Sequence, residues 1–200
     1  MSFSHELYTP LIENINSFVD ISEHESELVI SYFKPKMIAK KEFLLNKGDV
    51  SNHMRFIAEG CLRSYTLDNK VQEHILQFGI KGWWINDLYS YLSKKPATHF
   101  VQAIQSSTVL QIHRDSLEKL YNQVPSLERF FRIKFQTAYT SLQERHLDEM
   151  SLTAKERYED FQKKYRDIEQ SVPQYMIASY LGITPEHLSS LRKNSQSSLS

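Results

Sequence analysis

The sequence has little of what several protein classes require. It contains one cysteine, Cys61, in 200 residues, which excludes an internal disulfide framework and a cysteine-ligated iron–sulfur or structural zinc cluster. Its five glycines form no glycine-rich phosphate loop. No apolar run approaches the roughly 18 residues that span a bilayer, and the N-terminus lacks the basic and apolar segments of a signal peptide. These absences predict a soluble cytoplasmic protein without a membrane partner.

The chain also lacks a net charge. Its 24 Lys and Arg residues balance 24 Asp and Glu residues, so no overall electrostatic attraction draws it to nucleic acid. Any DNA binding would therefore need a local basic patch. Hydrophobic residues make up 40% of the chain and include 11 Tyr and 11 Phe. That supply is enough for the core of one large domain or of two small ones.

Patterns for catalysis and metal binding are missing as well. No Ser/His/Asp elbow occurs. The histidines in the middle of the chain, at positions 53, 74, 99 and 113, lie far apart, and no His-x-His pair exists. A cupin-type metalloenzyme, the alternative that a barrel with several histidines raises, needs two closely spaced histidines on one strand. We therefore expect no catalytic residues, no metal site and no enzyme.

The residue pattern of the N-terminal part of the chain is helical at first and then becomes typical of strands. Residues 7–18 show helical periodicity, and a second helix follows a capping box formed by Ser22 and Glu25. From Pro35 to Ile112, short runs rich in β-branched and aromatic residues alternate with turn signals. Many short strands at regular spacing predict an antiparallel sandwich or jelly roll.

Helical periodicity returns after the strands. A short helix from residue 114 to 121 precedes a longer one over residues 126–150, and a third helix begins after a new N-cap near Thr153. Residues 168–172 are expected to be a linker. The long helix has an apolar stripe that must be buried, either on its own barrel or against the same helix of a second subunit. The stripe residues are Phe131, Phe135, Ala138 and Leu142.

The segment 172–193 predicts a short helix, a tight turn and a second short helix. Gly182 supplies the left-handed geometry that ends a helix, and Thr184 is a suitable N-cap for the next one. Leu188 and Leu191 would bury the second helix against the first, leaving its polar side chains outside. This pattern is typical of a helix-turn-helix that reads a DNA major groove, and also of an ordinary helical hairpin.

A jelly roll, a long amphipathic helix and a terminal helix-turn-helix, in this order, resemble the Crp/Fnr family of bacterial transcription regulators. The segment Ile177–Glu186 is the strongest local match and resembles the shortened helix-turn-helix of Bacteroidetes members. The resemblance implies an α+β fold with three parts. They are N-terminal helices and a cyclic-nucleotide-binding-like β jelly roll at 1–125, a connecting and dimerisation helix at 126–150, and a helical DNA-binding domain at 151–200.

The resemblance also identifies a ligand cassette. Members that bind cyclic nucleotides carry a glycine, a glutamate and a later arginine, and the corresponding positions here are Asn86, Asp87 and Ala97. Without the guanidinium, a cyclic phosphate loses a charge-assisted and often bidentate contact. We therefore expect no binding of cyclic AMP in the usual way, and either no cofactor or an unknown small-molecule effector. The candidate pocket residues are Asn86, Asp87, Leu88, Ala97, Thr98 and His99.

Double-stranded DNA and a second copy of the chain are the partners that the resemblance implies, with RNA polymerase as a further candidate. Ser190 occupies a position where guanine-reading members carry arginine, which reduces discrimination among bases. A ligand-sensing or protein-interaction module that does not bind DNA is the alternative. The candidate DNA-binding residues are Gln174, Thr184, Glu186, His187, Ser189, Ser190, Arg192 and Lys193.

Overall fold

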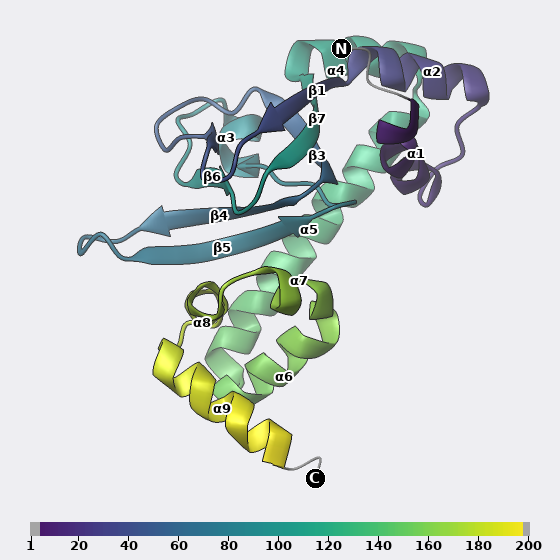
Figure 1. The fold of residues 1–200 in the computed structure, drawn as a ribbon. Coiled ribbons are helices and arrows are strands. Elements are labelled where there is room, and N and C mark those ends of the chain that lie inside the picture. The colour runs from purple at the N-terminus through teal and green to yellow at the C-terminus, as the bar shows by residue number, and fades with distance from the viewer. Residues whose placement is uncertain (1–4, 198–200) are drawn as a thin grey trace. The chain divides into compact units, whose positions relative to one another are not determined.

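The strands form two sheets, as the sequence predicts. The computed structural model describes residues 5–197, with side chains as far as residue 194. One sheet has the order β1-β7-β3 and the other the order β2-β6-β4-β5 (Figure 1). Strands β1 and β3 pair antiparallel with β7, and β2 pairs antiparallel with β6. The strands are β1 (Lys34–Ile38), β2 (Phe43–Leu45), β3 (His53–Glu59), β4 (Cys61–Leu67), β5 (Glu73–Ile80), β6 (Phe100–Ala103) and β7 (Ser107–His113).

The helices begin where the sequence carries capping signals. Ser22 and Thr153 form capping boxes with Glu25 and Glu156, which satisfies backbone N–H groups at both helix starts. Residues 166–171 form a helix, so the predicted linker was wrong there. No described helix is both long and apolar enough to cross a membrane. The helices are η1 (His5–Leu7), α1 (Thr9–Asn16), α2 (Glu23–Tyr32), α3 (Leu88–Ser93), α4 (Arg114–Gln123), α5 (Ser126–Ser151), α6 (Ala154–Lys164), α7 (Arg166–Ser171), α8 (Gln174–Leu181) and α9 (Pro185–Ser197).

The chain divides into two compact units. The first unit comprises Met1–Ser64 and Phe78–Ala138, and the second comprises Tyr65–Gln77 and Tyr139–Ser200. The boundary therefore lies inside α5, whereas the sequence predicts this helix as a separate part. The division also assigns the end of the β4–β5 hairpin to the second unit. The chain thus passes between the units at three points, once in each strand of the hairpin and once in α5.

Aromatic rings form the centre of the first unit's core. The Trp84 ring lies 5.4 Å from the Phe56 ring, 5.9 Å from Phe130 and 5.3 Å from Phe131, measured between centroids. Phe131 is only 2% exposed, and Phe135 packs against the same cluster. The assignment of Phe131 to a subunit interface was therefore wrong, because its ring is already buried within its own unit.

The β3–β4 connection depends on a glycine. Gly60 has a φ of +97°, and a Cβ atom at this position would lie 2.2 Å from the Ser107 Oγ atom. Both the backbone conformation and the close approach exclude a larger side chain without local rearrangement. Cys61, the next residue, is fully buried, and burial raises the pKa of its thiol to about 11. The cysteine is therefore a small core residue.

We expect the first unit to lose stability in mild acid because of His53. Burial lowers the pKa of His53 to about 4, and the charges of Arg55, His113 and Lys36 act in the same direction. An unfolded histidine titrates near pH 6.5. Between about pH 6.5 and pH 4 the unfolded chain therefore binds more protons at this residue, and the free energy of unfolding falls as the pH falls.

Urea unfolding followed by tryptophan emission would measure this effect, because both tryptophans, at positions 83 and 84, lie in the first unit. His53→Gln should flatten the loss of stability between about pH 7 and about pH 5. His24→Gln, at an exposed position, is the matched control. An unchanged pH dependence in His53→Gln would contradict the assignment.

Candidate effector cassette and nucleic-acid interface

The predicted cassette is organised around the buried carboxylate of Asp87. This side chain is 0% exposed and caps α3 by accepting a hydrogen bond from the Ser90 backbone N–H at 2.8 Å. Its second oxygen accepts from the Thr98 backbone N–H at 3.0 Å and lies 3.2 Å from His99 Nδ1. The acidic position of the cassette is therefore satisfied by groups of the chain itself.

The other predicted pocket residues also have partners within the first unit. The Asn86 amide oxygen accepts from the Arg55 backbone N–H at 3.0 Å, and Leu88 packs against the first unit's core. Ala97 is 3% exposed and belongs to an apolar cluster. Burial lowers the pKa of His99, although the Asp87 charge opposes the shift. His99 Nε2 is buried and has no hydrogen-bond partner among the described residues.

Two arginines that the sequence analysis did not select meet at Ser51, next to the cassette. Arg55 is 4% exposed, and its Nη1 donates to Ser51 Oγ at 3.1 Å. Arg114 Nη2 donates to the Ser51 carbonyl at 2.7 Å, and its guanidinium lies 4.8 Å from the Tyr91 ring centre. The sequence already contained a signal for this contact, because Arg55 interrupts the apolar run of β3. An arginine in such a run needs a polar partner when the strand is buried.

The groups around Asp87 and Ala97 determine whether an anionic ligand can bind at the cassette. The Ser90 backbone N–H at the start of α3 already donates to the Asp87 carboxylate. A phosphate would have to displace this carboxylate to bind the same N–H group. Ala97, which the sequence analysis places at the position of the family's arginine, is a buried methyl group. At the predicted cassette the chain thus offers a carboxylate and an apolar side chain, whereas a phosphate is bound by donors and positive charge.

The second unit contains the helix-turn-helix that the sequence predicts. Helix α8 ends at Gly182, which has a φ of +67°. Thr184 caps α9 by accepting a hydrogen bond from the His187 backbone N–H at 3.2 Å. Leu181 on α8 is 5% exposed and Leu188 on α9 is 1% exposed, so each helix buries an apolar side chain.

The polar side of α9 is exposed. Ser190 uses its hydroxyl within the helix, donating to the Glu186 carbonyl at 3.1 Å. Arg192 is half-buried, whereas the sequence predicts a fully outward side chain. The predicted residues that are exposed are Thr184, Glu186, His187, Ser189, Ser190 and Lys193.

A hollow of about 340 Å³ lies beside α9. It is lined by Gln174 at the start of α8, by Pro185 and Ser189, and by the two cations Arg192 and Lys193. Gln174 Oε1 is buried without a hydrogen-bond partner among the described residues. The structure thus brings together the two basic residues and the amide that the sequence analysis selected for DNA contact.

A guanidinium connects α8 to the β4–β5 hairpin within the second unit. Arg145 Nη2 donates to the carbonyls of Tyr180, at 3.0 Å, and Ile75, at 3.3 Å. The same guanidinium lies 4.1 Å from the Tyr180 ring centre. Ser179 Oγ accepts from the Ile75 backbone N–H at 3.1 Å and donates to the Glu73 carbonyl at 2.8 Å. These contacts hold the first helix of the helix-turn-helix against the hairpin.

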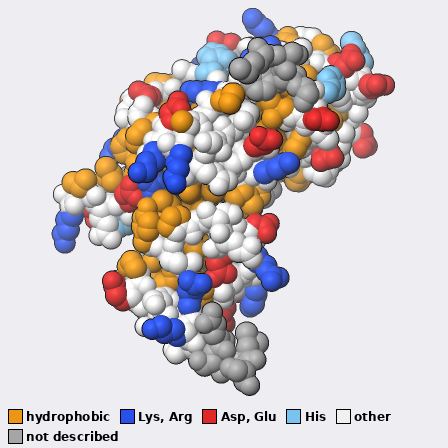
Figure 2. All heavy atoms as spheres, in the orientation of Figure 1, with side chains coloured by type: hydrophobic (Ala, Val, Ile, Leu, Met, Phe, Trp, Pro, Cys, Tyr) orange, Lys and Arg blue, Asp and Glu red, His pale blue; other side chains and the backbone are white. Residues whose placement is uncertain are grey.

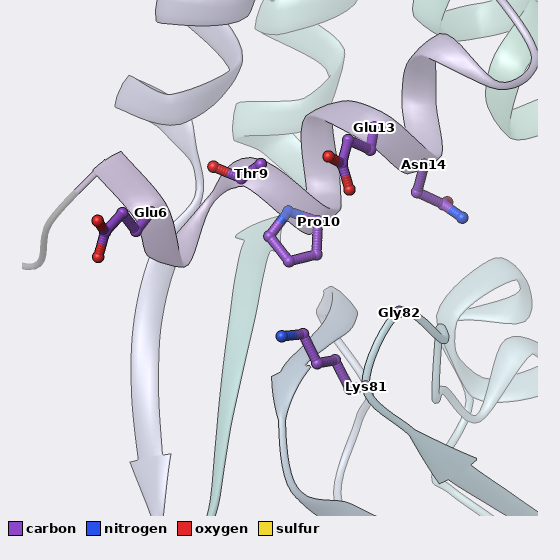
Figure 3. Close-up of a pocket in the computed structure, with 7 residues that line it drawn as sticks. All are labelled: Glu6, Thr9, Pro10, Glu13, Asn14, Lys81 and Gly82. Carbon is purple, nitrogen blue, oxygen red and sulfur yellow. The ribbon is translucent and has the colours of Figure 1, made fainter. Parts of the chain in front are cut away.

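Another hollow, of about 650 Å³, lies in the first unit between α1 and the turn after β5. Figure 3 shows Glu13 and Asn14 on the helix side and Lys81 and Gly82 on the facing turn. Asn14 accepts a hydrogen bond from Trp84 Nε1 at 3.0 Å, which ties α1 to the aromatic core. The charged residues of this hollow are exposed, as is common for a solvated surface.

Charge is mixed over the molecular surface. On the face that Figure 2 shows, basic side chains occur in small groups among acidic ones, as the net charge of zero leads one to expect. Within the described residues, no group of three or more His, Cys, Asp or Glu side chains could hold a metal ion. The cupin-type alternative therefore lacks a donor set in this part of the chain.

Comparisons with known proteins agree with the fold. Residues 35–124 match the family model described as a cyclic nucleotide-binding domain. The chain is 27% identical over 169 residues to the anaerobic regulatory protein of Haemophilus influenzae, covering 79% of this chain and 65% of that protein. It is 26% identical over 185 residues to the regulatory protein HlyX of Actinobacillus pleuropneumoniae, covering 86% and 75%. The chain thus spans a little less than two thirds of the Haemophilus protein.

A solved structure has the same fold. FixK2 from Bradyrhizobium japonicum superposes with a TM-score of 0.71 at 20% identity, covering 83% of this chain and 85% of that one. The superposition covers more of the chain than the cyclic nucleotide-binding match, which ends at residue 124.

Proposed function

We infer that this chain, whose residues 35–124 match a cyclic nucleotide-binding domain, is a Crp/Fnr-type, sequence-specific DNA-binding transcription regulator and not an enzyme. The observation that carries the inference is the pair α8 and α9, with its tight turn at Gly182 and the exposed polar side of α9. A helix held in this way can enter the DNA major groove with its polar residues facing the base edges.

The residues of α9 divide by the DNA group they can contact. Glu186 can accept from a cytosine amino group, and His187 can donate to a base acceptor. Ser190, whose hydroxyl donates to the Glu186 carbonyl, can still accept from a base amino group. Lys193 and Arg192, together with Gln174, line the hollow at the start of α8, and we assign them to the phosphate backbone. Phosphate contacts add affinity and orientation but little sequence information.

The chain is proposed to act as a dimer in the cytoplasm. Phe131 is buried in its own unit and is therefore not part of the proposed interface. The rest of the apolar stripe on α5 consists of Phe135, which is partly buried, and Ala138 and Leu142, which are exposed. Pairing through α5 would place two copies of α9 about 34 Å apart, so that they read two-fold symmetric half-sites one helical turn apart. RNA polymerase remains a further proposed partner.

We propose that the cassette does not bind cyclic AMP in the usual way. Its carboxylate at Asp87 is held by internal donors, and Ala97 supplies no positive charge. Titration calorimetry with cyclic AMP should give no saturable heat at concentrations up to about 1 mM, because the charge-assisted phosphate contact is missing. A saturable signal that is lost in Asp87→Asn would contradict this proposal.

Selection of bound duplexes from a random-sequence pool tests the DNA-binding function. The purified chain at near-physiological salt should enrich a two-fold symmetric motif without added ligand. If no motif is enriched, the selection is repeated with metabolites extracted from cells, because an effector could be required. Failure in both selections would favour the alternative, a module that senses a ligand or a protein without reading DNA.

A further inference from the structure

Two arginines from other helices hold the C-terminal end of α8, the first helix of the helix-turn-helix. Arg145 on α5 donates through Nη2 to the Tyr180 carbonyl at 3.0 Å. Arg157 on α6 donates through Nη2 to the Leu181 carbonyl at 3.3 Å. The last carbonyls of a helix lack partners within it, so cationic donors satisfy them and also interact favourably with the helix dipole. Helix α8 is therefore fixed at this end both to α5 and to α6.

The Tyr180 ring contacts the same two helices. The Arg145 guanidinium lies 4.1 Å from the ring centre, a distance at which a cation is attracted to an aromatic face. On α6, the Phe161 ring lies 5.5 Å from the Tyr180 ring, measured between centroids. The position of Arg145 on α5 is thus coupled through one ring to the aromatic side chains that α6 and α8 share.

The Arg145 guanidinium also holds the β4–β5 hairpin. Strand β5 lies at the edge of its sheet, so one side of its backbone has no neighbouring strand. Arg145 donates to the Ile75 carbonyl at 3.3 Å and to the Leu76 carbonyl. Ser179 on α8 accepts from the Ile75 backbone N–H at 3.1 Å and donates to the Glu73 carbonyl at 2.8 Å. Side chains of α5 and α8 therefore cover the strand edge, which would otherwise expose unpaired backbone groups.

The chemistry of arginine suits these several acceptors. Its planar fork offers five N–H donors in fixed directions, whereas a lysine carries the same charge on one compact group. Arg145 Nε lies 3.2 Å from Glu149 Oε1, one turn later on α5, and this ion pair orients the guanidinium from its own helix. The remaining nitrogens are left to bind α8 and the hairpin.

We propose that Arg145 is a positioning residue for DNA binding, which holds α8 on α5 and thereby sets the spacing of the half-sites that a dimer accepts. The recognition helix α9 follows α8 after the tight turn at Gly182, so the orientation of α8 relative to α5 determines that of α9. The proposal rests on the dimeric DNA-binding function inferred above, in which α5 pairs two copies of the chain. It assigns the spacing to a side chain outside the helix-turn-helix.

A role in stability alone makes a different prediction. Loss of packing within the second unit would weaken binding to one half-site and to two half-sites alike, whatever their separation. Loss of positioning leaves each recognition helix able to bind one half-site, but lets the pair accept other separations. One base pair more or fewer moves a half-site by about 3.4 Å along the DNA and rotates it by about 35°. Affinity as a function of spacing therefore separates the two roles.

The test compares the wild-type chain with Arg145→Ala and Arg145→Lys. Affinity is measured for a duplex with one selected half-site, and for duplexes with two half-sites at the selected spacing or at one base pair more or fewer. For Arg145→Ala we expect an unchanged half-site affinity, because Arg157 still caps α8. Affinity at the selected spacing should fall by about tenfold, which is part of the advantage of linked binding. Affinity at the neighbouring spacings should fall less, so the preference for one spacing is reduced. Arg145→Lys keeps the charge without the planar fork and should reduce the preference partially.

Arg129→Ala is the matched control, because it removes an exposed arginine from the same helix. Arg129 lies nine residues before Ala138 and therefore about 180° around α5 from the proposed interface. The control should leave the affinities and the spacing preference unchanged. Sedimentation equilibrium gives the oligomeric state of each variant, and thermal unfolding reports its fold.

The proposal is overturned if Arg145→Ala keeps the wild-type spacing preference, if it loses half-site and full-site affinity in equal proportion, or if it dissociates into monomers. Where Arg145→Ala does not fold, Arg145→Lys decides by the same criteria. Failure of the wild-type chain to bind any duplex would instead overturn the DNA-binding function, and this role with it.

Discussion

Replacing Leu142 with Asp is expected to convert the proposed dimer into a monomer and to weaken binding to a two-fold symmetric site by about 100-fold or more. Leu142 is 66% exposed in the single chain, and Ala138, four residues earlier on the same side of α5, is also exposed. Apolar side chains this exposed, at helical spacing, need a partner surface. A buried carboxylate at the centre of that surface would be strongly unfavourable.

The loss of affinity follows from the loss of simultaneous binding. When two recognition helices are linked, the second half-site binds at a high effective concentration, and that advantage disappears in a monomer. Affinity for a single half-site should change little, because α9 is not altered. Sedimentation equilibrium gives the oligomeric state, and fluorescence anisotropy with full-site and half-site duplexes gives the affinities.

Leu147→Asp is a matched control on the same helix. Leu147 is 58% exposed, but it lies five residues after Leu142 and therefore about 140° around the helix. It should leave the dimer intact. If Leu142→Asp is still a dimer, the stripe is not the subunit interface. Phe135 is a poorer choice for this test, because it packs against the core of its own unit and its replacement would also destabilise that unit.

The helix-turn-helix could be predicted from the sequence because its signals are local. The left-handed conformation at Gly182 and the cap at Thr184 depend on residues within a few positions of each other. The same holds for the capping boxes at Ser22 and Thr153. Alternating apolar runs likewise predicted the strands, since each run needs only its own pattern to indicate a half-buried strand.

Contacts between distant positions were not predictable in this way. Phe131 belongs to an apolar stripe that suits either a second subunit or its own barrel, and only the position of Trp84 decides between them. Arg192 is predicted from the sequence to be a solvated cation, yet its side chain is half-buried in the folded chain. Periodicity identifies which side of a helix is apolar, but it does not identify what covers that side.

Replacing Asp87 with Ala should destabilise the first unit by about 3–5 kcal/mol, the usual cost of removing one partner from a buried charged network. The carboxylate is 0% exposed and accepts from the backbone N–H groups of Ser90 and Thr98. Alanine would leave both donors, and the His99 ring 3.2 Å from the carboxylate, without their acceptor. Each buried donor left unpaired costs about 1–3 kcal/mol.

Asp115→Ala is the control, because its carboxylate is 77% exposed and lies 3.5 Å from His113 Nδ1, so its loss should cost less than about 1 kcal/mol. Urea unfolding followed by tryptophan emission reports on the first unit, which holds both tryptophans. A small effect of Asp87→Ala would mean that water or a bound ligand can replace the carboxylate. In that case the cassette would be open to a ligand after all, and the proposal that Asp87 occupies the phosphate position would be wrong. A large loss would instead establish Asp87 as a built-in anion that keeps the cassette folded without a ligand.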